Sequence, residues 1–356
     1  DTAVLDELKD RCPPRSDVTP ETLSAAYARI SRHPQSVDEL RAVARAEVDK
    51  ARRSNRSIIF KMGHHSVAEH AVFNFDIIGI SRRAIEELEK FRLCSYTEKS
   101  QRYIKLKDDF VTPEEVIRAG ERESFKDLIT AQNALYHELY RQLKPYFYRN
   151  NPDMAEDPTH RSVLNGWAKE DARYVVSLAT EGQLGMTINA RNLEFLIRRF
   201  ASQPLDELRR LQQGMYDLAK SVAPSIILFT DANAFDAETY PDLGREAAAL
   251  MGPPAEREER AVTRVDASTE GDIRLLAALL HTVSGRSYGE CHSKAEELTP
   301  SEKTELVKTA CRRMEFYDGP LREFEYPDLT YELILSATCF AQLKRHRMVT
   351  LTTQPY

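Results

Sequence analysis

Hydrophobic positions recur at helical spacing along much of the chain. The clearest case starts at Leu205 and continues through Leu208, Leu211, Met215 and Leu218. Intervals of three and four residues are typical of a helix that buries one face. The pattern therefore predicts an amphipathic helix over this stretch.

Three helix starts are visible in the polar residues. Thr112-Pro113 with Glu115 and Thr299-Pro300 with Glu302 have the form of capping boxes that carry proline at the first helical position. Thr19-Pro20-Glu21 is a weaker form of the same signal. Together with few glycines, these signals predict a helix-rich chain.

Short hydrophobic runs between the helices predict strands at Val72 to Ile78, Val262 to Val265, Tyr331 to Leu335 and Val349 to Leu351. The stretch from Pro241 to Arg260 contains Gly-Pro-Pro and then a charged run, which is typical of a domain boundary. Strands mixed with helices without a steady βαβ rhythm indicate the α+β class.

Composition narrows the class of protein. The 356 residues, with 42% hydrophobic residues, 30% charged residues and a net charge of −6, fit a globular protein of about two domains and argue against a nucleic-acid coat. We find no run long enough to span a membrane and no signal peptide. The five scattered cysteines favour a reduced, cytoplasmic setting. Because the chain starts at Asp1 and stops inside a motif, both ends look cut, and the sequence leaves open whether the native chain continues past Tyr356.

The two halves of the chain share a pattern. FDIIGIS (75–81) precedes a helix that ends in Lys90-Phe91-Arg92, and TYELILS (330–336) precedes one that ends in Arg345-His346-Arg347. The distance from the serine to the last arginine is the same in both. This shared register predicts a repeat, although few residues are identical.

Three histidines and a glutamate lie within residues 63–70, which suggests a zinc site. The spacing argues against it, because His65 and His70 do not share a helix face and the known H-E-x-x-H order is absent. A structural alternative is a capping box made by Ser66 and Glu69. We therefore expect no metal.

Two further clusters contain arginines. Glu98, Ser100 and Arg102 occupy alternate positions, so on an extended segment they would face one side and could bind a phosphate. Arg173 and the stretch Thr187–Arg191 could bind an anion and the edge of a heterocycle. Taken singly, each of these residues is more readily explained as part of a solvated, charged surface.

Taken together and in order, the motifs G-H-x-S-x-x-E-H, S-x-x-E-x-S-x-R-Y, E-x-A-R and T-x-N-A-R resemble the flavin-dependent thymidylate synthases over residues 20–235. The residues after Ala261 resemble the front part of a second copy. The resemblance implies an α+β fold with a mixed sheet flanked by helices, duplicated in tandem. We expect a first domain at 1–240 that holds the nucleotide half-site, a linker at 241–261 and a partial second domain at 262–356.

The resemblance implies an enzyme that converts dUMP to dTMP with FAD, NADPH and methylenetetrahydrofolate. Family members are homotetramers whose sites draw on several subunits. Carried over by position, dUMP would contact Glu98, Ser100, Arg102, Arg173 and Arg191, with Arg191 catalytic because it stabilises charge on the uracil. FAD would contact His64, Ser66, Asn189, Arg345, His346 and Arg347.

Each copy departs from the family pattern. Lys90-Phe91-Arg92 stands where the first copy should have Arg-His-Arg, and Thr97 and Phe195 replace residues that are usually polar. The second copy keeps Arg345-His346-Arg347, yet it lacks the Glu, Ser and Arg that should follow. We hypothesise that the first copy binds the nucleotide and the second contacts the flavin. One chain would then imitate a dimer, and a homodimer would imitate the tetramer.

Several alternatives stay open at this point. The chain could be a divergent flavoprotein with another one-carbon or nucleotide substrate. It could also be an inactive dUMP- or flavin-binding regulator or scaffold, with both copies decaying. A metal hydrolase built on the histidine cluster is the weakest alternative.

Overall fold

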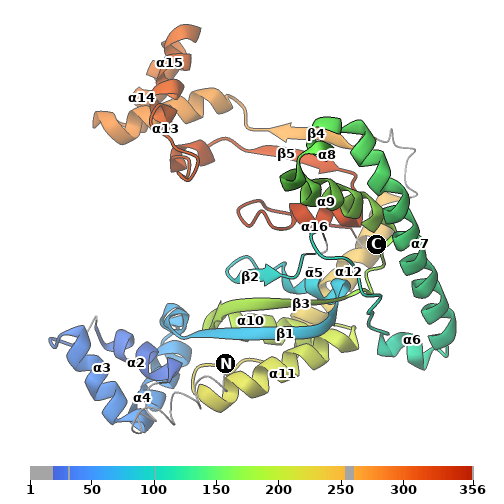
Figure 1. Ribbon diagram of the computed structural model, residues 1–356. Helices are drawn as coiled ribbons and strands as arrows, with labels where there is room; N and C mark the ends of the chain where they lie inside the picture. Colours follow the sequence, from blue (N-terminus) through green and yellow to red (C-terminus); the bar gives the residue numbers. More distant parts are fainter. Residues whose placement is uncertain (1–18, 31–32, 101, 253–259, 355–356) are drawn as a thin grey trace. The chain divides into compact units, whose positions relative to one another are not determined.

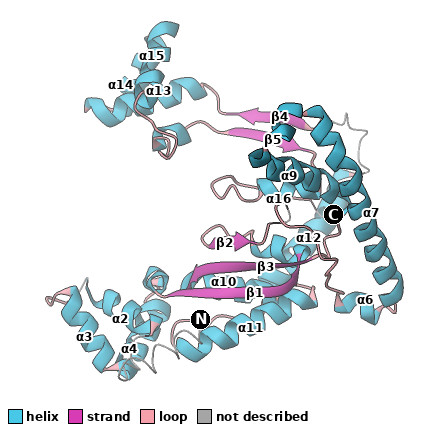
Figure 2. Ribbon diagram, viewed as in Figure 1, coloured by secondary structure: helices cyan, strands magenta, loops and turns pink. Residues whose placement is uncertain are grey.

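The computed structural model of the chain describes residues 19–30, 33–100, 102–252 and 260–354 (Figure 1). The chain divides into two compact units, one formed by Asp1–Pro254 with Ala337–Tyr356 and the other by Ala255–Ser336. Helices and strands occur in both units (Figure 2). The predicted α+β class is therefore confirmed.

A three-stranded antiparallel sheet lies at the centre of the first unit. Its order is β1 (Val72–Ser81), β3 (Glu181–Asn189), β2 (Ser95–Glu98). Alternate side chains of β1 are buried, as expected for a strand with one face on the core. The register shifts beside Gly79, whose φ of +76° is easily adopted only without a side chain.

Helices cover one face of this sheet. The contacting helices are α5 (Arg82–Leu88), α10 (Ala190–Ala201) and α11 (Asp206–Val222), and Figure 1 shows α10 and α11 running along β1 and β3. Leu208 and Met215 of α11 are buried in the main core, which confirms the helix predicted from the spacing after Leu205. Leu218 is largely exposed, so the predicted apolar face is buried only in part.

A buried carboxylate fixes the junction between β1 and α5. Glu207 accepts hydrogen bonds of 2.6 Å from both the backbone nitrogen and the hydroxyl of Ser81. The Ser81 hydroxyl in turn accepts from the backbone nitrogen of Ala84 at 3.1 Å and caps the helix. The chain therefore enters α5, and the Lys90-Phe91-Arg92 triplet after it, along a fixed path.

The remaining elements of the first unit surround this centre. The N-terminal elements are α2 (Pro20–Ile30), α3 (Val37–Ala46), α4 (Val48–Asn55), η1 (Arg56–Lys61) and η2 (His65–His70). The elements after β2 are α6 (Glu114–Arg118), α7 (Arg122–Asn150), α8 (Pro152–Glu156), η3 (Pro158–His160), α9 (Arg161–Ala172), η4 (Arg173–Val175) and α12 (Ala234–Met251). The helix α16 (Ala337–Leu343) also belongs to this unit, although it lies far along the chain.

The second unit has its own small core. Strands β4 (Val262–Ala267) and β5 (Leu329–Leu333) pair antiparallel. They correspond to the strands predicted at Val262 to Val265 and Tyr331 to Leu335. The helical elements are α13 (Gly271–Ser284), α14 (Tyr288–Glu297), α15 (Pro300–Cys311) and η5 (Arg322–Glu325). Side chains from α13 and α14 form the core. Thr299 and Glu302 make the predicted capping box at the start of α15.

Several local expectations are wrong. Val349 to Leu351 is irregular rather than a strand. Thr112 caps no helix, because α6 begins at Glu114 and Glu115 instead accepts a 2.7 Å hydrogen bond from the backbone of Asp206. Ser66 lies inside the 3₁₀ helix η2, which has no side-chain cap. At Glu115 a tertiary contact outweighs the local signal.

The predicted 241–261 linker begins inside α12, which continues through Pro241, and its residues 253–259 lie outside the described part of the chain. Across the described ranges, no helix combines the length and the apolar character that crossing a bilayer demands.

Candidate active site

A cluster of arginines lies where α9 ends and η4 begins. Arg173 is 7% exposed, and Arg82, at the start of α5, is 5% exposed. Burial, followed by the positive charge of Arg82, lowers the pKa of Arg173, although the nearby Glu170 opposes this. The Arg173 Nε is buried and has no hydrogen-bond partner in the described part of the chain. A buried guanidinium with an unused donor is suited to receive an anion.

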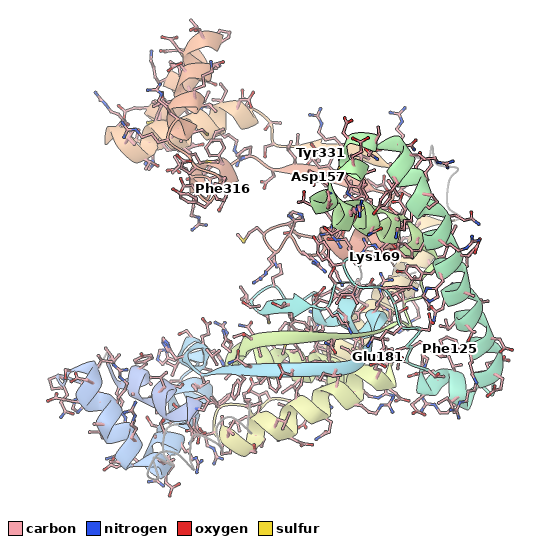
Figure 3. The ribbon with its side chains drawn as sticks, in the orientation of Figure 1. Phe125, Asp157, Lys169, Glu181, Phe316 and Tyr331 are labelled. Carbon is pink, nitrogen blue, oxygen red and sulfur yellow. The ribbon has the colours of Figure 1, made fainter. Side chains whose placement is uncertain are left out.

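Arg102 joins this cluster through Glu170. Its Nη1 lies 2.9 Å from a carboxylate oxygen of Glu170, and its charge also acts on Arg173. Lys169 on α9, labelled in Figure 3, donates a 2.6 Å hydrogen bond to the carbonyl oxygen of Tyr103. These contacts fix the segment after β2 against the end of α9.

The path of the chain between Glu98 and Arg102 differs from the prediction. Strand β2 ends at Glu98, and the chain then turns, with the Ser100 hydroxyl accepting a 3.2 Å hydrogen bond from the backbone of Arg102. The expectation of one extended segment with Ser100 and Arg102 on the same face is therefore wrong. Arg102 nevertheless pairs with Glu170 near the end of α9, and its charge acts on Arg173.

Within the first unit, the segment that follows α16 contacts residues near the end of α5 and in or just before β2 at three points. Arg345 donates a 3.0 Å hydrogen bond to the carboxylate of Glu98, and Arg347 donates one of 2.6 Å to the carbonyl oxygen of Cys94. The Lys344 ammonium lies 2.8 Å from the carboxylate of Glu89. The triplet Arg345-His346-Arg347 therefore lies against residues 94–98, where the S-x-x-E-x-S-x-R-Y motif begins.

The carboxylate of Glu98 is affected by positive charges from two places, namely Lys344 and Arg345 near the triplet and Arg82 in the arginine cluster. Burial, and then the negative charge of Glu89, raise the pKa of Glu98, while Lys344, Arg345 and Arg82 act in the opposite direction. Arg82 acts on both Glu98 and Arg173. The positive charges near the triplet therefore share Glu98 as a common neighbour with Arg82 of the arginine cluster.

The stretch Lys90-Phe91-Arg92, where the family pattern has Arg-His-Arg, contributes to aromatic packing. Phe91 is 9% exposed and makes edge-to-face contacts with Phe195, at 5.5 Å between ring centroids, and with Phe200, at 5.8 Å. The guanidiniums of Arg198 and Arg199 lie over the Phe195 ring. The two departures from the family pattern, Phe91 and Phe195, therefore contact each other, with Phe91 in the main core and Phe195 at its exposed edge.

The remaining predicted residues lie around η2 and the start of α10. His64 is exposed and directly precedes η2, which contains Ser66. Asn189 caps α10 by accepting a 3.0 Å hydrogen bond from the backbone nitrogen of Asn192, so its carbonyl oxygen has a structural role. Arg191 pairs with Glu69, which links it to the histidine segment.

Three residues of this site were not predicted. Arg82 follows the serine that caps α5, and its only sequence signal is its place in the serine-to-triplet register. Glu89 and Lys344 each lie one residue beyond the end of a short helix. Only the fold shows that they meet.

In the described part of the second unit, Glu270, His292 and Glu296 bring their ligand atoms within 4.8 Å of one another. Two of the three are exposed carboxylates, which commonly cluster without a metal. They lie outside the histidine cluster noted in the sequence.

The comparison with known families gives the class. The profile of the family described as "Thymidylate synthase complementing protein" matches residues 16–225, more than half of the chain. The flavin-dependent thymidylate synthase of Geobacter sulfurreducens is 33% identical over 217 residues, which cover 60% of this chain and 82% of that protein. The enzyme of Mycobacterium tuberculosis is 34% identical over 193 residues, covering 53% and 72%. The chain belongs to this family and is a thymidylate synthase-like enzyme.

Two solved structures have a weaker similarity. The UMP/dUMP methylase PolB from Streptomyces cacaoi has a TM-score of 0.41 and 19% identity, covering 58% of this chain and 88% of that one. The flavin-dependent thymidylate synthase ThyX from Helicobacter pylori, solved with FAD and dUMP, has a TM-score of 0.37 and 20% identity, covering 59% and 96%.

Proposed function

We propose that the chain methylates dUMP to dTMP, with methylenetetrahydrofolate as the carbon donor, NADPH as the reductant and FAD as the bound cofactor. Family membership supports the reaction. The observation that carries the proposal is the contact of Arg345 with Glu98, because it brings the intact triplet of the second copy to the nucleotide motif of the first.

The arginine cluster suits the phosphate of dUMP. Arg102, Arg173 and Ser100 would bind the phosphate oxygens, and Arg82 would add positive charge beside them. The Nε of Arg173 has no hydrogen-bond partner among the described residues and can therefore act as a donor. One guanidinium can bind two phosphate oxygens through two parallel hydrogen bonds. The phosphate would also compete with Glu170 for Arg102, which explains how a residue paired in the free protein could serve as a ligand.

The triplet suits the flavin. Arg345 and Arg347 each use one terminal nitrogen in the contacts described above, so further donors on each guanidinium can meet a flavin phosphate or carbonyl oxygen. His346 is exposed at the same place. The donor set therefore fits FAD. When bound, FAD would pass on the hydride that NADPH supplies, and methylenetetrahydrofolate would supply the carbon.

The other family positions take supporting roles in this proposal. Glu98 orders dUMP, and Arg191 stabilises the charge that develops on the uracil ring. Ser66 and His64 lie beside the flavin, with Asn189 available through its amide nitrogen, since its oxygen caps α10. Arg191 would exchange its pairing with Glu69 for the substrate.

The order of elements supports the tandem organisation. In 19–92, the helices α2, α3 and α4 precede the 3₁₀ helix η2, strand β1 and helix α5, and the triplet position follows. In 271–347, the order is α13, α14, α15, η5, β5 and α16, again followed by the triplet, with no described counterpart of the π-helix η1 that lies between α4 and η2. We therefore retain the division into 1–240, 241–261 and 262–356, and a homodimer of tandem chains that imitates the family tetramer.

One observation favours a second candidate. Phe91 stands where the family pattern has histidine, and its side chain is buried, so the first copy has no imidazole at this position. This is expected if the chain has become an inactive dUMP-binding protein. The test measures FAD in the purified full chain, then NADPH oxidation with and without dUMP. We expect bound FAD and faster oxidation when dUMP is present. Colourless protein that still binds dUMP would support the inactive alternative.

A further inference from the structure

The ion pair between Lys344 and Glu89 stands apart from the other ion pairs at the triplet. Its side chains are only 6% and 7% exposed, whereas Arg345 in the neighbouring pair is 47% exposed. Lys50 and Glu47 on the surface of the same unit have the same 2.8 Å separation, but they are 61% and 44% exposed. Exposed pairs contribute little, whereas the loss of one partner of a buried pair is strongly destabilising.

Both residues of the pair lie at the ends of short helices. Lys344 follows the last residue of α16, and its backbone nitrogen donates to the carbonyl oxygen of Phe340 at 3.0 Å. Glu89 follows the last residue of α5 in the same way, donating to Ile85 at 2.9 Å. Helices of this length are marginal alone, so a contact between their ends helps to hold the two segments together.

The triplet begins at the next residue. Consecutive Cα atoms are about 3.8 Å apart, so fixing Lys344 restricts where Arg345 and His346 can lie. The contacts of Arg345 with Glu98 and of Arg347 with Cys94 are exposed or partly exposed, and water can compete for them. The buried pair is the contact that water cannot reach.

We propose that the Lys344–Glu89 ion pair anchors the triplet to the first unit, which makes Lys344 and Glu89 positioning residues for the shared site. They hold Arg345, His346 and Arg347 in place before any ligand binds, without contacting the reacting atoms. The effect on flavin affinity rests on the proposed function, whereas the anchoring itself does not.

Hydrogen–deuterium exchange of the ligand-free full chain tests the anchor. We expect Lys344→Met and Glu89→Met each to speed exchange of residues 337–347 by about a hundredfold, because each leaves one buried charge without a partner. The double variant should recover most of the protection, since no buried charge remains. Lys50→Met is the matched control, with the same separation in an exposed pair, and should leave this exchange unchanged.

FAD binding gives the second readout. If the anchor positions the triplet, each single variant weakens FAD binding about tenfold or more and the double variant restores part of it. Unchanged exchange in the single variants, or losses that simply add in the double variant, would overturn the anchor. Wild-type protein that binds no FAD, with the exchange pattern as expected, would instead overturn the proposed function and leave the anchor standing.

Discussion

Arg345 and Glu98 are 247 positions apart in the chain, yet the guanidinium of one donates a 3.0 Å hydrogen bond to the carboxylate of the other. Glu98 belongs to the S-x-x-E-x-S-x-R-Y motif of residues 95–103, and Arg345 opens the Arg-His-Arg triplet of residues 345–347. Their contact joins two motifs that are each incomplete. The predictions below follow from this relationship and from the packing around it.

Replacing Arg345 tests its part in flavin binding. Arg345→Met should weaken FAD binding by about ten- to a hundredfold, because methionine cannot donate to a phosphate or carbonyl oxygen. Fluorescence titration of FAD measures this. Arg141→Met is the control, since Arg141 forms an exposed pair with Glu138 on α7. Equal FAD affinity in Arg345→Met and the control would contradict the role.

The pKa of Glu98 predicts a pH dependence of stability. Burial and Glu89 raise this pKa above its usual 4.5, so the folded protein retains a proton that the unfolded chain has already released. The stability that Glu98 contributes is therefore fully present below about pH 4.5 and declines as the pH rises through the raised value. Urea unfolding of wild type and Glu98→Gln should show the wild type losing stability relative to the variant across this window. A relative gain would mean that Arg345 and Lys344 outweigh burial.

Phe91 should be a core residue and no longer a flavin ligand. Phe91→His restores the family residue but places a polar ring among Phe195 and Phe200, which should lower the free energy of unfolding by about 2–4 kcal/mol. It should add no second flavin. Phe91→Leu, which stays apolar, should cost about 1–2 kcal/mol. Two FAD per chain in the histidine variant would refute this account.

The arginine cluster should recognise the phosphate rather than the base. Arg173→Met should raise the Kd of dUMP by about ten- to a hundredfold, because the buried site loses a charged donor. Deoxyuridine lacks the phosphate, so its affinity should be the same in wild type and variant. Calorimetric titration with both ligands makes the comparison. An equal loss for both would show a general disruption of the pocket.

Local signals predicted much of the fold. The spacing after Leu205 predicts α11, and the runs at Val72 and Val262 predict strands, because both depend on which residues face the core. The run at Val349 also consists of residues that favour strands but is no strand, since a strand also needs a partner to pair with. Similarly, the Thr112 cap fails because Glu115 contacts α11 instead.

The candidate site is harder to predict, because its contacts join residues far apart in the chain. The motif order drew attention to Arg102 and Arg173, and the structure shows Glu170 between them. Nothing in the sequence pairs Lys344 with Glu89. Phe91 could be recognised only as a departure from a pattern, and its partner Phe195 becomes evident only from the packing.

We propose that the triplet at residues 345–347 completes the site to which Arg102 and Arg173 contribute. The most direct test removes the exposed imidazole with His346→Ala and measures both ligands on the same preparation of the full chain. We expect His346→Ala to lose FAD while it binds dUMP as the wild type does, because the substitution leaves Arg82, Arg102 and Arg173 unchanged. Full FAD occupancy in His346→Ala, with unchanged NADPH oxidation in the presence of dUMP, would contradict it.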